Sequence, residues 1–223
     1  MGERCKIAVF DLDGTLIKGS SFNRFIWFIL KKLFKSGHLW LGIIILYNFI
    51  FQAFRLKTRA YAKYKIMQVA DVICSSDDYY EFAINIVKSM RSDLLGQLYD
   101  LQHNNIHTVL LSASPDQYVK QIAAILNFDY VAGTYSANTW GKYYETRGER
   151  KLQILKTLLP ENSVIDSVFT DHHDDFMLID FSKGAKVYLI NPSKKLKSLC
   201  DSYKIDYKIN IQHDLECLSK RLL

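Results

Sequence analysis

Cysteine is scarce in this chain of 223 residues, which contains only 4. The cysteines lack the C-x-x-C spacing of many zinc and redox sites and are too sparse for a disulfide framework. They are Cys5, Cys74, Cys200 and Cys217. We therefore expect reduced thiols and a cytoplasmic protein. The sequence also lacks internal repeats and low-complexity linkers, which argues against a repeat architecture.

An Arg-rich or aromatic-basic nucleic-acid recognition motif is missing too, although the chain is basic overall. Its 29 Lys and Arg against 23 Asp and Glu give a formal net charge of +6, and the basic residues are spread along the sequence. Such a charge suits anionic small molecules or an anionic lipid surface. We expect no nucleic-acid partner.

The amino terminus carries no sign of a targeting signal. Residues 1–6 lead directly into an apolar stretch that is too short for the core of a secretory signal. Lys6 stands where the N-myristoylation pattern requires Ser or Thr, so we do not expect acylation of Gly2.

Residues 36–54 contain no Asp, Glu, Lys or Arg and are long enough to cross a bilayer. A single crossing there would separate Asp11 from Ser112, and no second run of similar length brings the chain back. If these two residues share one site, the segment does not cross the bilayer as a single transmembrane helix. Two alternatives stay open: a buried helix, as at an oligomer contact, or peripheral contact with the inner face of a membrane between Leu39 and Phe54.

Three apolar stretches, each expected to be a buried strand, stop at a cluster of polar residues. The clusters are Asp11-Leu12-Asp13-Gly14-Thr15, Ser112-Ala113-Ser114 and Asp171-His172-His173-Asp174-Asp175. The carboxyl ends of parallel strands border one crevice, so the three clusters can converge on a single ligand. So many carboxylates in one crevice require a cation, and oxygen ligands favour Mg²⁺.

The order of expected strands and helices predicts an α/β fold with a doubly wound parallel sheet. Residues 20–102 show no strand alternation and are expected to be helical. Strand-like and helical runs alternate from about residue 105 onward, as in βαβ units. The strand-like runs are 106–111, 164–169 and 186–190, and the helical runs are 116–126, 149–159, 174–181 and 194–203. We expect a core of residues 1–16 and 105–223 with an all-helical cap domain, residues 17–104, inserted into it.

Asp11 and Asp13 project the same way at the end of the first expected strand and can fan toward one substrate. A carboxylate that attacks phosphorus forms an aspartyl phosphate, which divides one difficult displacement into two easier ones. Asp11 is the candidate nucleophile. Asp13 is the candidate general acid and base, which protonates the leaving oxygen and later deprotonates the attacking water. Gly14 permits the tight turn that such a loop needs.

The string Asp11-Leu12-Asp13-Gly14-Thr15-Leu16 resembles the first motif of haloacid dehalogenase (HAD) superfamily phosphatases. Ser112 matches the second motif, in which a hydroxyl and the following backbone N–H, here that of Ala113, hold phosphoryl oxygens. The pattern Asp171-x-x-x-Asp175 matches the fourth motif. The resemblance extends from residue 7 to about residue 196 and implies a Rossmann-like core of the phosphoserine-phosphatase-like branch.

The third motif of this branch has a lysine in a G-x-x-K setting, and Gly148-Glu149-Arg150-Lys151 resembles it. The resemblance implies that Lys151 neutralises phosphate charge and holds Asp11 ionised. Arg147 and Arg150 are alternatives for this role.

A Mg²⁺ cofactor follows from the same resemblance, held by the Asp11 side chain, the Asp13 backbone carbonyl and Asp171. The last Asp of the fourth motif would bond the lysine or a metal-bound water. Spacing favours Asp175 for this supporting role over its neighbour Asp174.

His172 and His173 depart from the family pattern, which usually has Gly or Ser after the first Asp of the fourth motif. A histidine pair beside carboxylates suggests zinc or iron, but adjacent histidines are expected to point apart. We therefore expect local packing or a pH-sensitive neighbour.

The cap sequence bears on the substrate. Phosphoserine phosphatases have a Glu that pairs with the substrate amino group where this chain has Ser20, which weakens a phosphoserine assignment. Residues 22–25 and the apolar run after them resemble the cap of bacterial phosphatidylglycerophosphate phosphatases.

We predict a Mg²⁺-dependent phosphomonoester hydrolase whose substrate is a small or amphipathic phosphorylated molecule. The alternatives are a lipid phosphate phosphatase at a membrane interface, a phosphoserine phosphatase, and a catalytically silent binding module with the same fold. The natural substrate and the oligomeric state stay open.

Overall fold

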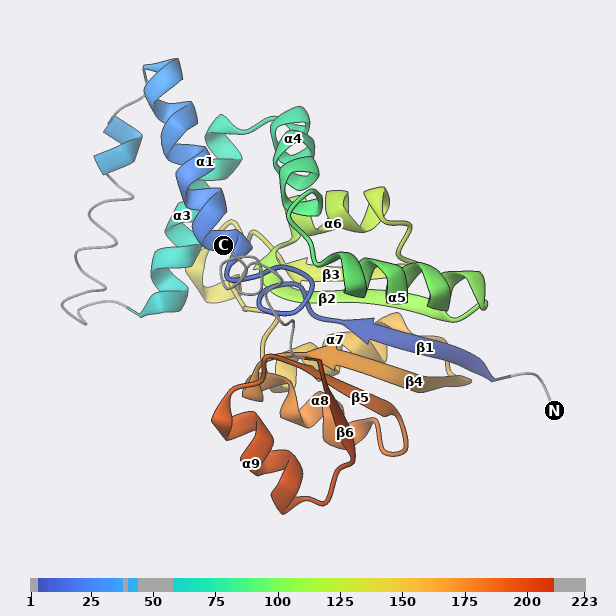
Figure 1. Ribbon diagram of the computed structural model, residues 1–223. Coiled ribbons are helices and arrows are strands. Elements are labelled where there is room, and N and C mark those ends of the chain that lie inside the picture. The colour runs from blue at the N-terminus through green and yellow to red at the C-terminus, as the bar shows by residue number, and fades with distance from the viewer. Residues whose placement is uncertain (1–3, 38–39, 44–57, 211–223) are drawn as a thin grey trace, which may run out of the picture.

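The computed structural model describes residues 4–37, 40–43 and 58–210, and in this part of the chain six parallel strands form one sheet (Figure 1). The strand order is β3-β2-β1-β4-β5-β6. The bounds are β1 Cys5–Phe10, β2 His107–Pro115, β3 Tyr130–Thr134, β4 Ser163–Thr170, β5 Lys186–Ile190 and β6 Tyr207–Asn210. The predicted doubly wound α/β fold is therefore confirmed. The switch point, at which such sheets bind ligands, lies between β1 and β4.

The helices of the described residues fall into an inserted group and a group of strand connections. Between β1 and β2 lie α1 Ser21–Ser36, α3 Arg59–Ile73, α4 Ser76–Val87 and α5 Ser92–His103. The later helices are α6 Asp116–Ile125, α7 Glu149–Leu158, α8 Phe176–Phe181 and α9 Lys194–Ser202, with 3-10 turns at Trp140–Lys142 and His173–Asp175. Figure 1 shows α1 and α3 standing beyond the carboxyl ends of the strands, whereas α5 runs along the sheet.

The sheet is covered on both faces, as expected for parallel strands. Ala8 and Phe10 of β1 pack against the inserted helices and α6, whereas Ile7 and Val9 pack against α7, α8 and α9. All four side chains are buried. The short apolar run before Asp11 is therefore an interior strand. Because this strand is buried on both faces, Asp11 at its end is held in a fixed place.

Three details of the sheet differ from the sequence-based prediction. Strand β2 continues to Pro115, so Ser112 and Ser114 belong to the strand instead of following it. Strands β3 and β6 were not predicted. They are short, with 5 and 4 residues, and most of their positions are only half-buried or exposed, so neither has a strong apolar signal.

Among the described residues, no helix combines the length and the apolar character needed to cross a bilayer. Most of the apolar run between Leu39 and Phe54 lies outside the described residues. The choice between a buried and a membrane-facing segment therefore stays a prediction.

Candidate active site

Asp11 is the first residue beyond β1 and is fixed by the backbone of the neighbouring strand. Its N–H donates a 3.0 Å hydrogen bond to the carbonyl oxygen of Phe169 in β4. The carboxylate thereby lies at the switch point, and only 8% of the residue is exposed.

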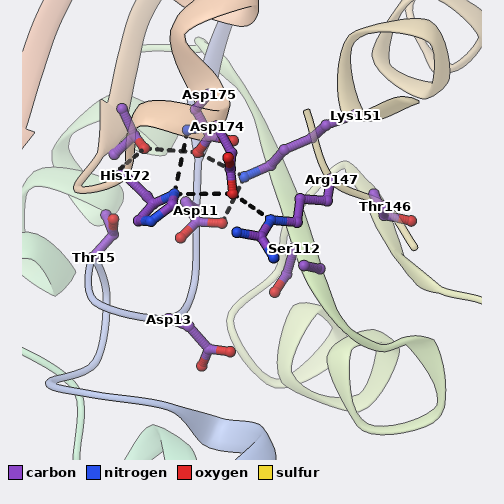
Figure 2. Close-up of polar contacts among 12 residues, drawn as sticks. Asp11, Asp13, Thr15, Ser112, Thr146, Arg147, Lys151, His172, Asp174 and Asp175 are labelled. Atoms are coloured by element: carbon purple, nitrogen blue, oxygen red, sulfur yellow. Dashed lines mark hydrogen bonds and ion pairs between the residues drawn. The ribbon is translucent and has the colours of Figure 1, made fainter. Parts of the chain in front are cut away.

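Lys151 links two of the predicted acidic residues (Figure 2). It lies in the first turn of α7, and its Nζ is 2.6 Å from Asp11 Oδ1 and 2.8 Å from Asp175 Oδ2. The hydroxyl of Thr170 donates a 2.7 Å hydrogen bond to the same Oδ2. All of these groups are buried. Three segments that are far apart in the sequence therefore meet at one ammonium group.

Asp171 packs directly over the Gly14 backbone. A Cβ atom on Gly14 would lie 2.1 Å from Asp171 Oδ2, and the φ angle of Gly14 is +84°. The Thr15 hydroxyl lies 3.4 Å from Asp171 Oδ1. Only glycine leaves room for this carboxylate beside the Asp11 loop.

Burial and mutual repulsion shape the charges of this cluster. Burial raises the pKa of Asp171 to about 6, with a further contribution from Asp175. Burial also raises the pKa of Asp11, and Lys151 opposes this shift. Burial acts to lower the pKa of Lys151, but the carboxylates of Asp11 and Asp175 outweigh it and raise that pKa above its usual value. Three carboxylates thus face one ammonium group, and the cluster favours an additional cation.

Ser112 and Ala113 lie beside this cluster and line the same cavity. The Ser112 Oγ accepts a 3.1 Å hydrogen bond from the Ser114 N–H, which orients the hydroxyl within the strand end. Asp13 also lines the cavity, but Figure 2 shows its carboxylate apart from the Asp11 and Lys151 pair. Ser114 and the backbone of Ser21 bond its two oxygens.

The comparison with known proteins agrees with this arrangement. Over residues 8–179, more than half of the chain, the sequence matches the family described as haloacid dehalogenase-like hydrolase. The chain belongs to this family. The predicted membership of the HAD superfamily is thus confirmed, and the protein is a HAD-like hydrolase. No curated protein matches the sequence.

Solved structures show the same fold. A protein of unknown function from Bordetella pertussis Tohama I has a TM-score of 0.70 and 16% identity, and the match covers 93% of this chain and 99% of that chain. A phosphoserine phosphohydrolase-like protein from Francisella tularensis has a TM-score of 0.54 and 15% identity, covering 98% and 100% of the two chains. At these identities the likeness supports the fold alone.

The hydrolase has a cavity of about 450 Å³ over the acidic cluster, of a size suited to a small ligand. Its lining includes all the predicted site residues and several others that the sequence analysis did not single out. These others are Gly19, Asn23, Arg59, Lys63, Glu145 and Thr146. The polar residues of α3 carry no recognisable motif, so only the fold brings them to the cavity.

Lys63 is the most buried of these additional charged groups, with 7% of the residue exposed. Its Nζ lies 2.9 Å from Glu145 Oε1 and donates a 2.6 Å hydrogen bond to the carbonyl oxygen of Ala113. Burial lowers the pKa of Lys63, and Glu145 opposes the shift. This lysine joins the inserted helix α3 to the strand end that carries Ser112.

Arg147 and Arg150, the alternatives to Lys151, have other partners, although Arg147 lines the same cavity. Arg147 forms an ion pair with Asp174, and Arg150 donates a 3.3 Å hydrogen bond to Gln153. Asp174 and Asp175 therefore face different basic partners, and Asp175 is the one that contacts Lys151.

The two histidines are not arranged as expected. The rings of His172 and His173 lie side by side, with centroids 4.1 Å apart, and both approach Asp174. The expectation that they point apart is wrong, because the 3-10 turn at His173–Asp175 folds both rings toward one carboxylate. Ligand atoms of the three residues lie within 4.8 Å of one another. The Arg147 guanidinium already neutralises Asp174, which disfavours a metal ion there.

Proposed function

We propose that this HAD-like hydrolase is a phosphatase that cleaves phosphomonoesters through an aspartyl-phosphate intermediate. The observation that supports this most directly is the buried contact of Lys151 with Asp11 and Asp175 at the switch point of the sheet. One oxygen of Asp11 is bonded to the lysine, and the residue also lines the cavity. A carboxylate fixed in this way is oriented to attack a bound phosphoryl group.

The donor set fits Mg²⁺. The carboxylates of Asp11 and Asp171 and the backbone carbonyl of Asp13 are hard oxygen ligands, and all three residues line the cavity. The cluster has more carboxylates than ammonium groups, and Gly14 leaves the space in which Asp171 lies. These three oxygens would hold the ion, with Asp175 supporting the site. When bound, Mg²⁺ would neutralise negative charge on the phosphoryl oxygens.

The remaining residues divide the work between binding and proton transfer. Lys151, the Ser112 hydroxyl and the Ala113 N–H bind phosphoryl oxygens. Asp13 gives a proton to the leaving oxygen while the bond between Asp11 and phosphorus forms. The same carboxylate then removes a proton from the water that hydrolyses this bond.

The cap of this enzyme is proposed to be residues 17–104, inserted into a core of residues 1–16 and 105–223. Within it, α1 and α3 contribute Asn23, Arg59 and Lys63 to the cavity wall. Helix α5 buries Leu94 and Leu98 and packs against the β2 side of the sheet. The part of the cap that selects the leaving group is therefore the part before α5.

The proposed substrate is a small or amphipathic phosphomonoester. Ser20 lines the cavity and caps α1. It stands where a phosphoserine phosphatase has the carboxylate that binds the substrate amino group, so this chain has no carboxylate at that position. Charged groups of both signs, among them Arg59, Lys63 and Glu145, line the rest of the wall and suit a polar leaving group.

Replacement of the nucleophile tests the proposal. The Asp11→Asn variant should lose turnover of 4-nitrophenyl phosphate by at least about 1000-fold while keeping its melting temperature within a few degrees. Asp206→Asn, at an exposed position that does not line the cavity, is the matched control and should retain full activity. Retained activity in Asp11→Asn would contradict the proposed mechanism. A wild type with no turnover, with or without Mg²⁺, would favour a catalytically silent module.

A lipid phosphate substrate is a second candidate, because α1 exposes aromatic side chains. Trp27 is 67% and Phe34 is 77% exposed, and their spacing places them with Lys31 on one face of the helix. Trp40, 61% exposed, and Ile43, 67% exposed, follow shortly after the helix. Aromatic and basic side chains on one exposed face suit an anionic membrane interface.

Vesicle co-sedimentation tests this candidate. The wild type should sediment with phosphatidylglycerol vesicles more than with phosphatidylcholine vesicles, and the double variant Trp27→Ser/Phe34→Ser should lose most of this binding. Tyr135→Ser, which removes another side chain that is 67% exposed, is the control and should bind as the wild type does. Equal sedimentation of the double variant and the wild type would contradict membrane docking through α1.

A further inference from the structure

A chain of hydroxyl groups leads from the Asp13 carboxylate into the contact between the inserted helices and the core. The Ser114 hydroxyl donates a 2.7 Å hydrogen bond to Asp13 Oδ2. The Ser21 Oγ lies 2.9 Å from the Ser114 Oγ and 2.9 Å from the Tyr118 phenolic oxygen. Ser21 and Tyr118 are 0% exposed and Ser114 is 1% exposed. None of these hydroxyls has a role in the proposed chemistry.

The direction of each hydrogen bond follows from the carboxylate at one end. An ionised carboxylate only accepts, so Ser114 donates to Asp13. Each hydroxyl has a single proton, so Ser21 donates to Ser114, and Tyr118 donates to Ser21. Burial raises the pKa of Tyr118 well above its usual value, and its hydroxyl therefore keeps its proton. Every proton of the chain then has one acceptor.

The second oxygen of Asp13 is held by the first residue of α1. The Ser21 backbone N–H donates a 2.6 Å hydrogen bond to Asp13 Oδ1. The N-terminus of a helix also favours a negative charge. Asp13 is thus bonded through both oxygens, and one partner belongs to an inserted helix whereas the other, Ser114, belongs to β2.

Tyr118 connects this network to the packing of the inserted helices. Its ring centroid lies 5.0 Å from that of Phe25 in α1 and 4.9 Å from that of Phe82 in α4. Figure 1 shows α4 beside α6, the helix that carries Tyr118. The seating of α1 and α4 on the core therefore fixes the outermost hydroxyl of the network.

We propose that Ser21, Ser114 and Tyr118 are positioning residues that orient the Asp13 carboxyl for proton transfer when α1 is seated on the core. The inference rests on the proposed function, in which Asp13 protonates the leaving oxygen as its bond to phosphorus breaks and the bond from phosphorus to Asp11 forms. A carboxylate has about four lone-pair sites, and the two hydrogen bonds fix two of them. Asp13 also lines the cavity, and a remaining lone-pair site carries the transferred proton.

Two aryl phosphates of nearly equal size separate this role from a structural one. Phenolate is a poorer leaving group than 4-nitrophenolate and depends more on a proton from Asp13. The measurement is kcat/KM for phenyl phosphate and 4-nitrophenyl phosphate with the wild type and with Ser114→Ala, Ser21→Ala and Tyr118→Phe. The ratio of the two values is independent of the fraction of folded enzyme, so partial unfolding of a variant does not alter it.

The variants should lower kcat/KM for phenyl phosphate more than for 4-nitrophenyl phosphate. Ser114→Ala, which removes a direct partner of Asp13, should change the ratio by roughly 10-fold or more, and Tyr118→Phe, at the far end, by less. Matched controls are Ser167→Ala and Tyr143→Phe, which remove buried hydroxyls with no hydrogen-bond partner among the described residues. Neither control residue lines the cavity, and both variants should keep the wild-type ratio.

The outcomes distinguish this inference from the proposed function. A wild type that hydrolyses neither ester overturns both. A wild type that hydrolyses both esters, with variants that lose activity equally on the two or lose none, overturns the positioning role alone. A selective loss on phenyl phosphate, absent from the two controls, supports it.

Discussion

Lys151 shows why the identity of one residue matters at this site. Its ammonium group reaches both Asp11 and Asp175 at hydrogen-bond distance, and all three residues are buried. The two neighbouring arginines are directed to Asp174 and Gln153. A compact ammonium with three donors suits two converging carboxylates, whereas the planar guanidinium of Arg147 pairs with the more exposed Asp174.

Gly14 is a residue at which one added methyl group should have a large effect. In Gly14→Ala the new Cβ would collide with Asp171, and alanine would be forced to a positive φ. We expect a loss of about 1–3 kcal/mol in the free energy of unfolding. Displacement of Asp171 should also reduce turnover by roughly 100-fold. Urea unfolding and the aryl phosphate assay measure the two effects.

The control for this change is Gly96→Ala, in helix α5. A Cβ there meets no atom within 4 Å, and the backbone is helical. This variant should be more stable than the wild type by about 0.5–1 kcal/mol, with unchanged turnover. If Gly14→Ala behaves like Gly96→Ala, the packing of Asp171 over Gly14 is wrong.

Helix α4 is stabilised at its start by a capping box. The Ser75 hydroxyl accepts a hydrogen bond from the Asp78 N–H, and the Asp78 carboxylate accepts one from the Ser75 N–H. Lys32 of α1 also bonds Asp78, at 2.6 Å. The capping box at the start of α4 is therefore bonded to α1, which helps to keep these two helices together.

The Ser75→Ala variant should lose about 1 kcal/mol in the free energy of unfolding at pH 7. Burial acts to raise the pKa of Asp78, but bonds from Lys32 and Ser75 outweigh it and lower that pKa. A lowered pKa means that the ionised carboxylate stabilises the folded state at neutral pH. This contribution is lost as the pH falls through the lowered pKa. The variant lacks the 2.7 Å hydrogen bond from the Ser75 hydroxyl to this carboxylate, so the difference in stability between wild type and variant should shrink in acid.

Urea unfolding of both proteins at neutral and acidic pH provides the measurement. Ser198→Ala, an exposed serine within α9, serves as the control and should change stability by less than about 0.5 kcal/mol. A difference between Ser75→Ala and the wild type that stays constant with pH would contradict a stabilising bond from the Ser75 hydroxyl to the ionised Asp78 carboxylate.

At the scale of the whole molecule, the acidic cluster brings together residues that are far apart in the sequence. Asp11 and Asp171, for example, are separated by 160 positions. Repulsion among its carboxylates opposes folding in the absence of a cation. A Mg²⁺ ion that binds only the folded state should therefore stabilise the protein.

Saturating MgCl₂ should raise the melting temperature by several degrees, because about 2.7 kcal/mol is gained at 100 times the dissociation constant. The Asp171→Asn variant should lose most of this shift, as should the wild type after addition of excess EDTA. NaCl at equal ionic strength serves as the control and should produce little change. A shift of equal size in Asp171→Asn would contradict Mg²⁺ binding at Asp171.

Much of the core was predictable because its signals are local. Strands β1 and β4 each end in four buried residues, 7–10 and 167–170, and each is followed at once by aspartate. Strands β3 and β6 have weaker patterns, and tertiary pairing decides their conformation. The orientation of His172 and His173 was predicted incorrectly because it depends on a 3-10 turn and on Asp174.

The amino-acid order alone indicated the doubly wound sheet, the superfamily and the acidic residues, because strand periodicity and short motifs depend on neighbours in the chain. Ser21, Lys63, Glu145 and Tyr118 carry no such signal. They reach the cavity or the chain of hydroxyl groups that ends at Asp13 only when helices from distant parts of the chain pack against the sheet. The hydrogen bonds and ion pairs across that contact join groups that are remote in sequence.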